Sequence, residues 1–120
     1  MRIISAPFGP LTDAQWRHLA VHMAMKKADG KIHFNYDPDI SLPFKLAQND
    51  VTLWPIWNNV TCPTLIVRGE NSDLLLADTV EKMKQGRANV QSAEIANTGH
   101  APMLMDEEQI QLVREFLRQE

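Results

Sequence analysis

Apolar and polar positions divide the second half of the chain into alternating strands and helices. Residues 64–69, TLIVRG, are apolar on both faces, which predicts a buried strand, and residues 88–97 predict a second strand. Amphipathic helices are expected over 76–85, after the first strand, and over 106–120, after the second. The order strand, helix, strand, helix predicts an α/β fold with two parallel strands.

The first half of the chain predicts a helix followed by less regular structure. Apolar residues recur at helical spacing, and the helix is expected to begin at Thr12, where Gln15 completes a capping box. Gly30 suits the left-handed position that ends a helix, so the helix is predicted to extend over 12–30. Residues 32–36 then alternate, which predicts a short strand or an extended segment.

Capping residues mark two further helix starts. Asp50 is expected to cap a short helix that presents Trp54 and Trp57 together. Asp106 is expected to cap the last helix, with Gln109 completing a capping box.

Composition narrows the classes of function. The chain has 120 residues, 44% of them hydrophobic, and a formal net charge of -3, which fits an ordinary globular domain and gives no basic footprint for nucleic acid. No apolar run approaches the roughly 18 residues of a membrane span, and the first residues do not resemble a signal peptide, so a cytoplasmic protein is expected. The single cysteine, Cys62, excludes an internal disulfide and has no neighbours at metal-ligand spacing. No cofactor is expected.

Acidic residues and a histidine follow the two predicted strands. The segment GENSD places Glu70 and Asp73 after the first strand, and NTGH places His100 after the second. Reactive groups of open α/β sheets gather beyond the carboxyl ends of strands, and adjacent strands lie about 4.8 Å apart. An acid and a histidine on these loops can therefore hydrogen-bond, and the acid would fix the imidazole tautomer and stabilise the imidazolium.

These segments carry a resemblance to a known family. CPTLIVRGENSDLL, followed by AEIANTGHAPML, resembles the C-terminal half of the α/β-hydrolase fold. The resemblance implies that Asp73 is the acid and His100 the base of a catalytic triad, with Glu70 as a substitute acid. FGPLTDAQWRHL and DGKIHFNYDP resemble the helical cap of such hydrolases, and DVTLWPIW resembles the segment that returns from the cap to the core. The implied organisation is a helical cap segment over 1–60 and a β-α-β-α core segment over 61–120, which together make a partial α/β-hydrolase fold.

One departure limits what the resemblance implies. The family's nucleophile stands in a G-x-S-x-G turn, which this sequence does not contain. None of its serines has flanking glycines; they are Ser5, Ser41, Ser72 and Ser92. The resemblance therefore implies a fragment of an esterase-like or lipase-like hydrolase acting on a small apolar ester, with the nucleophile outside this sequence. The chain alone is expected to be inactive, and no substrate-binding residue is assigned.

Two other interpretations stay open. A non-enzymatic remnant would act as a dimerisation or partner-binding module, because two parallel strands leave an open edge that favours self-association or pairing with the missing N-terminal half. A zinc site would use His18 and His22, which stand at i and i+4 on one helix face. No acidic base and no third ligand are evident beside this pair, so no metal is expected.

Overall fold

The computed structural model describes residues 8–46 and 52–119, which form two compact units. One unit holds the described residues within 13–59, and the other holds 60–119 together with 8–12. The assignment of 1–60 to a cap and of 61–120 to a core remains a prediction.

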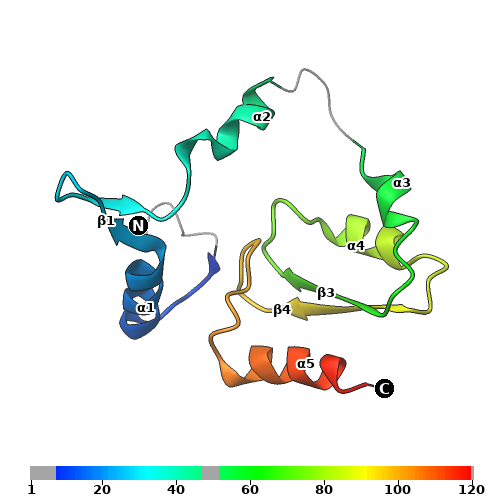
Figure 1. Cartoon of the computed structure of the whole chain (residues 1–120). Helices are drawn as coiled ribbons and strands as arrows, with labels where there is room; N and C mark the ends of the chain where they lie inside the picture. The colour runs from blue at the N-terminus through cyan, green and yellow to red at the C-terminus, as the bar shows by residue number, and fades with distance from the viewer. Residues whose placement is uncertain (1–7, 47–51, 120) are drawn as a thin grey trace. The chain divides into compact units, whose positions relative to one another are not determined.

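The unit within 13–59 begins with a helix and a hairpin (Figure 1). Helix α1 spans Asp13–Met23, and strands β1 (Ala24–Lys26) and β2 (Ile32–Phe34) pair antiparallel. Short helices follow: η2 (Pro38–Ser41), α2 (Leu42–Leu46) and α3 (Trp54–Trp57).

The prediction of one helix over 12–30 is wrong beyond Met23. Alanine, methionine and lysine favour helix, yet residues 24–26 form a strand because their backbone groups pair with β2. Gly30 does adopt the left-handed conformation, with φ 77. It does so in the hairpin turn, where its N–H donates to the Lys27 carbonyl oxygen at 3.0 Å, and not at a helix end.

Helix α3 begins without a capping side chain. Leu53 occupies the N-cap position and makes no side-chain hydrogen bond there, while Asp50, the expected cap, lies outside the described residues. Trp54 and Ile56 are 39% and 66% exposed, so this helix presents apolar side chains at its surface.

The second unit is built on a parallel sheet. Strand β3 (Thr64–Gly69) pairs with β4 (Val90–Ile95), from Thr64 opposite Val90 to Gly69 opposite Ile95. Helix α4 (Ala77–Lys84) connects the strands, and α5 (Glu107–Leu117) follows β4. The predicted order of strand, helix, strand, helix in a parallel α/β arrangement is confirmed (Figure 1).

Helices α4 and α5 lie on opposite sides of this sheet (Figure 1). Gln91 and Glu94 are an odd number of residues apart in β4, so their side chains project from opposite faces. The Gln91 amide donates to Oε1 of Gln119, just beyond α5, at 2.6 Å. Glu94 lines a hollow with Val80 and Glu81 of α4. Each face of the sheet therefore has one helix of its own.

The start of α5 differs in one detail from its predicted capping box. The Asp106 carboxylate accepts from the Gln109 N–H at 2.9 Å, as expected. The Gln109 side chain does not close the box. Its Oε1 accepts instead from the N–H of Leu104, at 2.9 Å, where the chain turns through a left-handed conformation with φ 51. The glutamine thus stabilises the turn that enters the helix.

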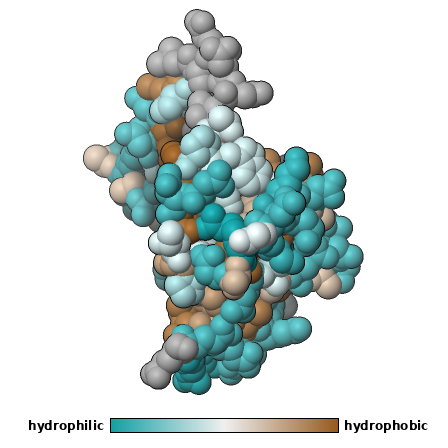
Figure 2. All heavy atoms as spheres, turned by 90° about the vertical axis from the view of Figure 1, so that its right-hand side faces the viewer, coloured by the Kyte–Doolittle hydropathy of each residue, from teal (hydrophilic) through white to brown (hydrophobic). Residues whose placement is uncertain are grey.

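Burial is shallow in both units. No large side chain among the described residues is fully buried, and the buried apolar residues are Leu19, Ile66, Val80 and Val90. Apolar side chains reach the surface among hydrophilic ones on the face that Figure 2 shows. A two-stranded sheet has few inward positions, which explains the small core. Within the part of the chain that the structure describes, no helix has the length and apolar character needed to cross a bilayer.

Candidate active site

Hydrogen bonding between the two strands continues past their carboxyl ends. The N–H of Glu70 donates to the Ile95 carbonyl oxygen at 2.9 Å, and the N–H of Asn71 donates to the Thr98 carbonyl oxygen at 2.9 Å. The loop after β3 and the loop after β4 are therefore held side by side by backbone groups.

The two predicted catalytic residues face each other across these loops. Oδ1 of Asp73 lies 3.5 Å from Nδ1 of His100. This separation is within ion-pair range but longer than the usual hydrogen bond of about 2.9 Å. The His100 side chain is 28% exposed and that of Asp73 is 79% exposed. The structure brings the two residues together, and their catalytic roles remain a prediction.

The Nδ1 atom of His100 is buried, and no group within the described residues forms a hydrogen bond with it. A buried polar atom without a partner costs about 1–3 kcal/mol, so a small movement of the Asp73 carboxylate toward this nitrogen is favourable. Hydrogen bonds of catalytic groups are often long before substrate binds.

An aromatic ring contacts the imidazole from a segment that sequence reasoning did not connect with it. The rings of Phe8 and His100 meet edge to face, with centroids 6.1 Å apart and planes at 74°. An edge-to-face arrangement is one of the favourable ones for two rings.

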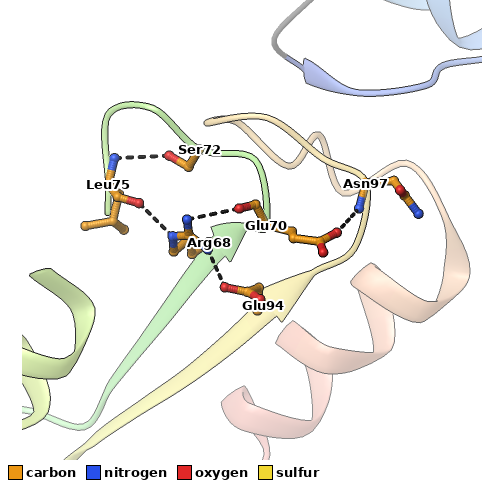
Figure 3. A network of polar contacts seen from close by, with 6 residues as sticks. All are labelled: Arg68, Glu70, Ser72, Leu75, Glu94 and Asn97. Atoms are coloured by element: carbon orange, nitrogen blue, oxygen red, sulfur yellow. Dashed lines mark hydrogen bonds and ion pairs between the residues drawn. The ribbon is translucent and has the colours of Figure 1, made fainter. Parts of the chain in front are cut away.

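Glu70, the alternative acid, has a different partner. Its Oε2 accepts from the backbone N–H of Asn97 at 2.8 Å (Figure 3). Asn97 has φ 54, a left-handed conformation that asparagine tolerates better than most residues. This hydrogen bond holds the loop that leads to His100. Because the Glu70 carboxylate is engaged with the Asn97 backbone, Asp73 is the carboxylate available to the imidazole.

A buried arginine of β3 joins the loop after that strand to strand β4 (Figure 3). The Arg68 side chain is 10% exposed. Its Nε donates to the Leu75 carbonyl oxygen at 2.7 Å, and Nη2 donates to the Glu70 carbonyl oxygen at 3.0 Å. Its Nη1 forms an ion pair with Glu94 of β4. Sequence reasoning missed this cluster, although an arginine inside an apolar strand is itself a signal, since buried arginines need partners.

Known proteins similar to this chain are hydrolases. A 3-hydroxybutyrate-oligomer hydrolase of Cupriavidus necator is 36% identical over an alignment of 125 positions, which spans 97% of this chain and 43% of that protein. The structure of a protein from Rickettsia typhi assigned as a hydrolase matches with a TM-score of 0.84 and 34% identity, over 99% of this chain and 40% of that one. The structure of an α/β hydrolase from Novosphingobium aromaticivorans matches with a TM-score of 0.77 and 32% identity, over 97% of this chain and 43% of that one. No protein-family model matches.

The chain has a partial α/β-hydrolase fold. It spans less than half the length of these three proteins, from 40% to 43%. The resemblance seen in the sequence is confirmed at the level of the fold.

Within residues 8–46 and 52–119, the serines of this partial α/β-hydrolase fold stand in places unlike a nucleophile turn. Ser41 is the last residue of η2. Ser72 is only 6% exposed, and its Oγ accepts from the N–H of Leu75 at 3.0 Å, which closes the turn around Asp73. Ser92 lies within β4. Ser5 lies outside the described residues.

The histidine pair considered for zinc lies on α1. The rings of His18 and His22 are 4.2 Å apart between centroids, and Nδ1 of His22 lies 2.8 Å from the His18 carbonyl oxygen. Across residues 8–46 and 52–119, no three or more His, Cys, Asp or Glu residues gather closely enough to hold a metal ion.

Proposed function

We propose that this chain supplies the acid and the base of a serine-type ester hydrolase. Asp73 is the acid and His100 is the base. The observation that carries the proposal is the 3.5 Å approach of Oδ1 of Asp73 to Nδ1 of His100 at the carboxyl ends of parallel strands. The nucleophilic serine stands in a G-x-S-x-G turn of polypeptide outside these residues, since the sequence has no such turn.

In this proposal the two imidazole nitrogens have different roles. Nδ1 of His100 is directed to Asp73, which leaves Nε2 for the serine hydroxyl. When Nδ1 carries the proton, Nε2 has a free lone pair and acts as the base. The Asp73 carboxylate holds this tautomer and stabilises the positive charge that the ring gains.

The reaction then follows two balanced steps. In the first, the serine oxygen attacks the ester carbonyl carbon while Nε2 takes its proton, and the imidazolium returns that proton to the leaving alcohol as the C–O bond breaks. In the second, water attacks the acyl-serine, gives one proton to Nε2 of His100, and releases the acid as the serine oxygen recovers that proton. The histidine is unchanged at the end of the cycle.

The substrate class follows from the Cupriavidus relative. Its name specifies oligomers of 3-hydroxybutyrate, and units of a hydroxy acid join through ester bonds between hydroxyl and carboxyl groups. With 36% identity over 97% of this chain, the same class of short hydroxy-acid ester is the substrate we propose. This class is a small ester, as the sequence resemblance implies, but its terminal carboxylate and hydroxyl group make it more polar than the apolar ester expected there.

The test uses a chimera, in which this chain replaces the matching segment of the Cupriavidus hydrolase. Hydrolysis of a 3-hydroxybutyrate dimer is followed for the chimera and for its His100→Ala and Asp73→Asn variants. We expect losses in kcat on the order of 10⁴-fold for each, because the histidine loses its role or its tautomer.

Asp78→Asn is the matched control, since Asp78 is an exposed aspartate in the first turn of α4. It removes the same charge outside the proposed site and is expected to keep full activity. An active chimera whose Asp73→Asn and His100→Ala variants retain that activity contradicts the proposal. The chain alone is expected to hydrolyse no ester.

A further inference from the structure

One side chain, that of Arg68, forms hydrogen bonds with both ends of the loop that carries Asp73. The Arg68 guanidinium donates to the carbonyl oxygen of Glu70, where the loop begins, and to that of Leu75, where it ends. Asp73 stands between these two residues in the sequence, directly after Ser72. Because the guanidinium is a rigid plane, its two donors set the separation of the two carbonyl groups.

Asp73 itself has little else to fix it. Its side chain is 79% exposed, so packing does not set the carboxylate's position. The backbone of the loop must therefore do so. Within the turn, the Leu75 N–H donates a hydrogen bond to Oγ of Ser72. From strand β3, Nε of Arg68 donates to the carbonyl oxygen of Leu75 and so ties the end of the turn to the sheet.

The guanidinium is also fastened to the strand that leads to His100. Arg68 and Glu94 are directly opposite each other in the register of β3 and β4, and they form an ion pair. His100 follows β4 in the chain. The three contacts of Arg68 thus connect the loop that carries Asp73 to strand β4, which leads to His100.

We propose that Arg68 is a positioning residue, which sets the carboxylate of Asp73 at Nδ1 of His100 without touching either. This inference rests on the proposed pairing of acid and base. A lysine at position 68 would keep the charge but, as a point donor, would not hold the two carbonyl groups at one spacing. The role therefore depends on the planar shape of the group and not on its charge alone.

The experiment reads the tautomer of His100 in the full chain and needs no catalytic activity. Long-range ¹H–¹⁵N NMR spectra are recorded at pH about 8.5, where imidazole is neutral. The signals are assigned by their loss in His100→Gln. In the unaltered chain we expect the proton on Nδ1, held by Asp73. The Asp73→Asn variant gives the reference spectrum of His100 without the carboxylate. In that variant we expect the ring proton to shift from Nδ1 toward Nε2.

Arg68→Met is expected to lose the Nδ1–H signature and to give the spectrum of Asp73→Asn. Arg114→Met is the matched control, because Arg114 forms an ion pair with Glu107 within α5. This substitution also removes a paired arginine, but outside the loop that carries Asp73. It is expected to leave the His100 signals unchanged.

The outcomes separate the two proposals. If Arg68→Met stays folded and keeps the Nδ1–H signature, the positioning role is overturned and the pairing stands. If the unaltered chain already matches Asp73→Asn, both are overturned. If circular dichroism shows that Arg68→Met is unfolded, the Arg68→Lys variant is measured instead. A shift of its His100 signals toward the Asp73→Asn spectrum supports the role of the planar guanidinium, and an unchanged Nδ1–H signature overturns that role.

Discussion

A Cβ atom at Gly69 would overlap the carbonyl oxygen of Gly99, the residue before His100. It would also lie 2.8 Å from the carbonyl carbon of Thr98, closer than side-chain carbons approach backbone atoms. Glycine at the end of β3 is thus what allows the loop of the acid and the loop of the base to run in contact. The absence of one methyl group is a condition for the geometry of the candidate site.

Gly69→Ala is therefore expected to push the two loops apart. The clash is with backbone, which cannot rotate away, so the free energy of unfolding should fall by about 1–3 kcal/mol, as for overpacked sites. Chemical denaturation of the chain followed by circular dichroism measures this change.

Gly30→Ala supplies the control for the loss of glycine itself. At Gly30 an added Cβ has nothing within 4 Å, but φ is +77, so alanine is strained by conformation alone. The cost expected there is about 1–2 kcal/mol, with no effect on the loops that carry Asp73 and His100. If Gly69→Ala leaves the NMR signals of both loops unchanged, the position of the two loops does not depend on the missing side chain at Gly69.

Glu70 is expected to act through the backbone of Asn97 and not as an acid of the triad. Removing its carboxylate by Glu70→Ala leaves the Asn97 N–H without its acceptor, so hydrogen exchange at this amide should accelerate. Glu70→Gln keeps an acceptor oxygen and should keep most of the protection. In the chimera, Glu70→Gln should also retain activity. Loss of activity comparable to that of Asp73→Asn would mean that the acid has been assigned to the wrong residue.

The free edge of β3 is expected to pair with another strand. The N–H groups of Thr64 and Glu70 point to β4, so those of the odd-numbered residues between them point to the other edge. Among the described residues no strand lies on that edge. Sedimentation velocity should show association that grows with concentration, and Val67→Pro, which removes an outward N–H, should weaken it. A folded monomer at all concentrations would contradict this prediction.

Much of the second unit could be predicted because its signals are local. The apolar run of β3, the helix stripe of α4 and the cap Asp106 each lie within a few neighbouring residues. The first unit shows the limit of such signals. Residues 24–26 have helical propensity but form a strand, because a partner at 32–34 outweighs a preference of a few tenths of a kcal/mol per residue.

The candidate site was predictable in part for the same reason. The positions of Asp73 and His100 after two strands predicted their approach, since parallel strands bring their carboxyl ends to one edge. The bond from Asn97 to Glu70 and the three contacts of Arg68 depend on where distant loops meet in space. No spacing along the chain specifies those contacts.

The central claim is that Asp73 acts only through His100, and a double-mutant cycle in the chimera tests it most directly. Values of kcat/KM are measured for the chimera, for Asp73→Asn, for His100→Ala and for the double variant. When two residues act as one unit, the effects of substituting them on kcat/KM are strongly non-additive. The kcat/KM of the double variant should therefore be no lower than that of His100→Ala alone. If the two losses multiply, the carboxylate and the imidazole act independently and the account is wrong.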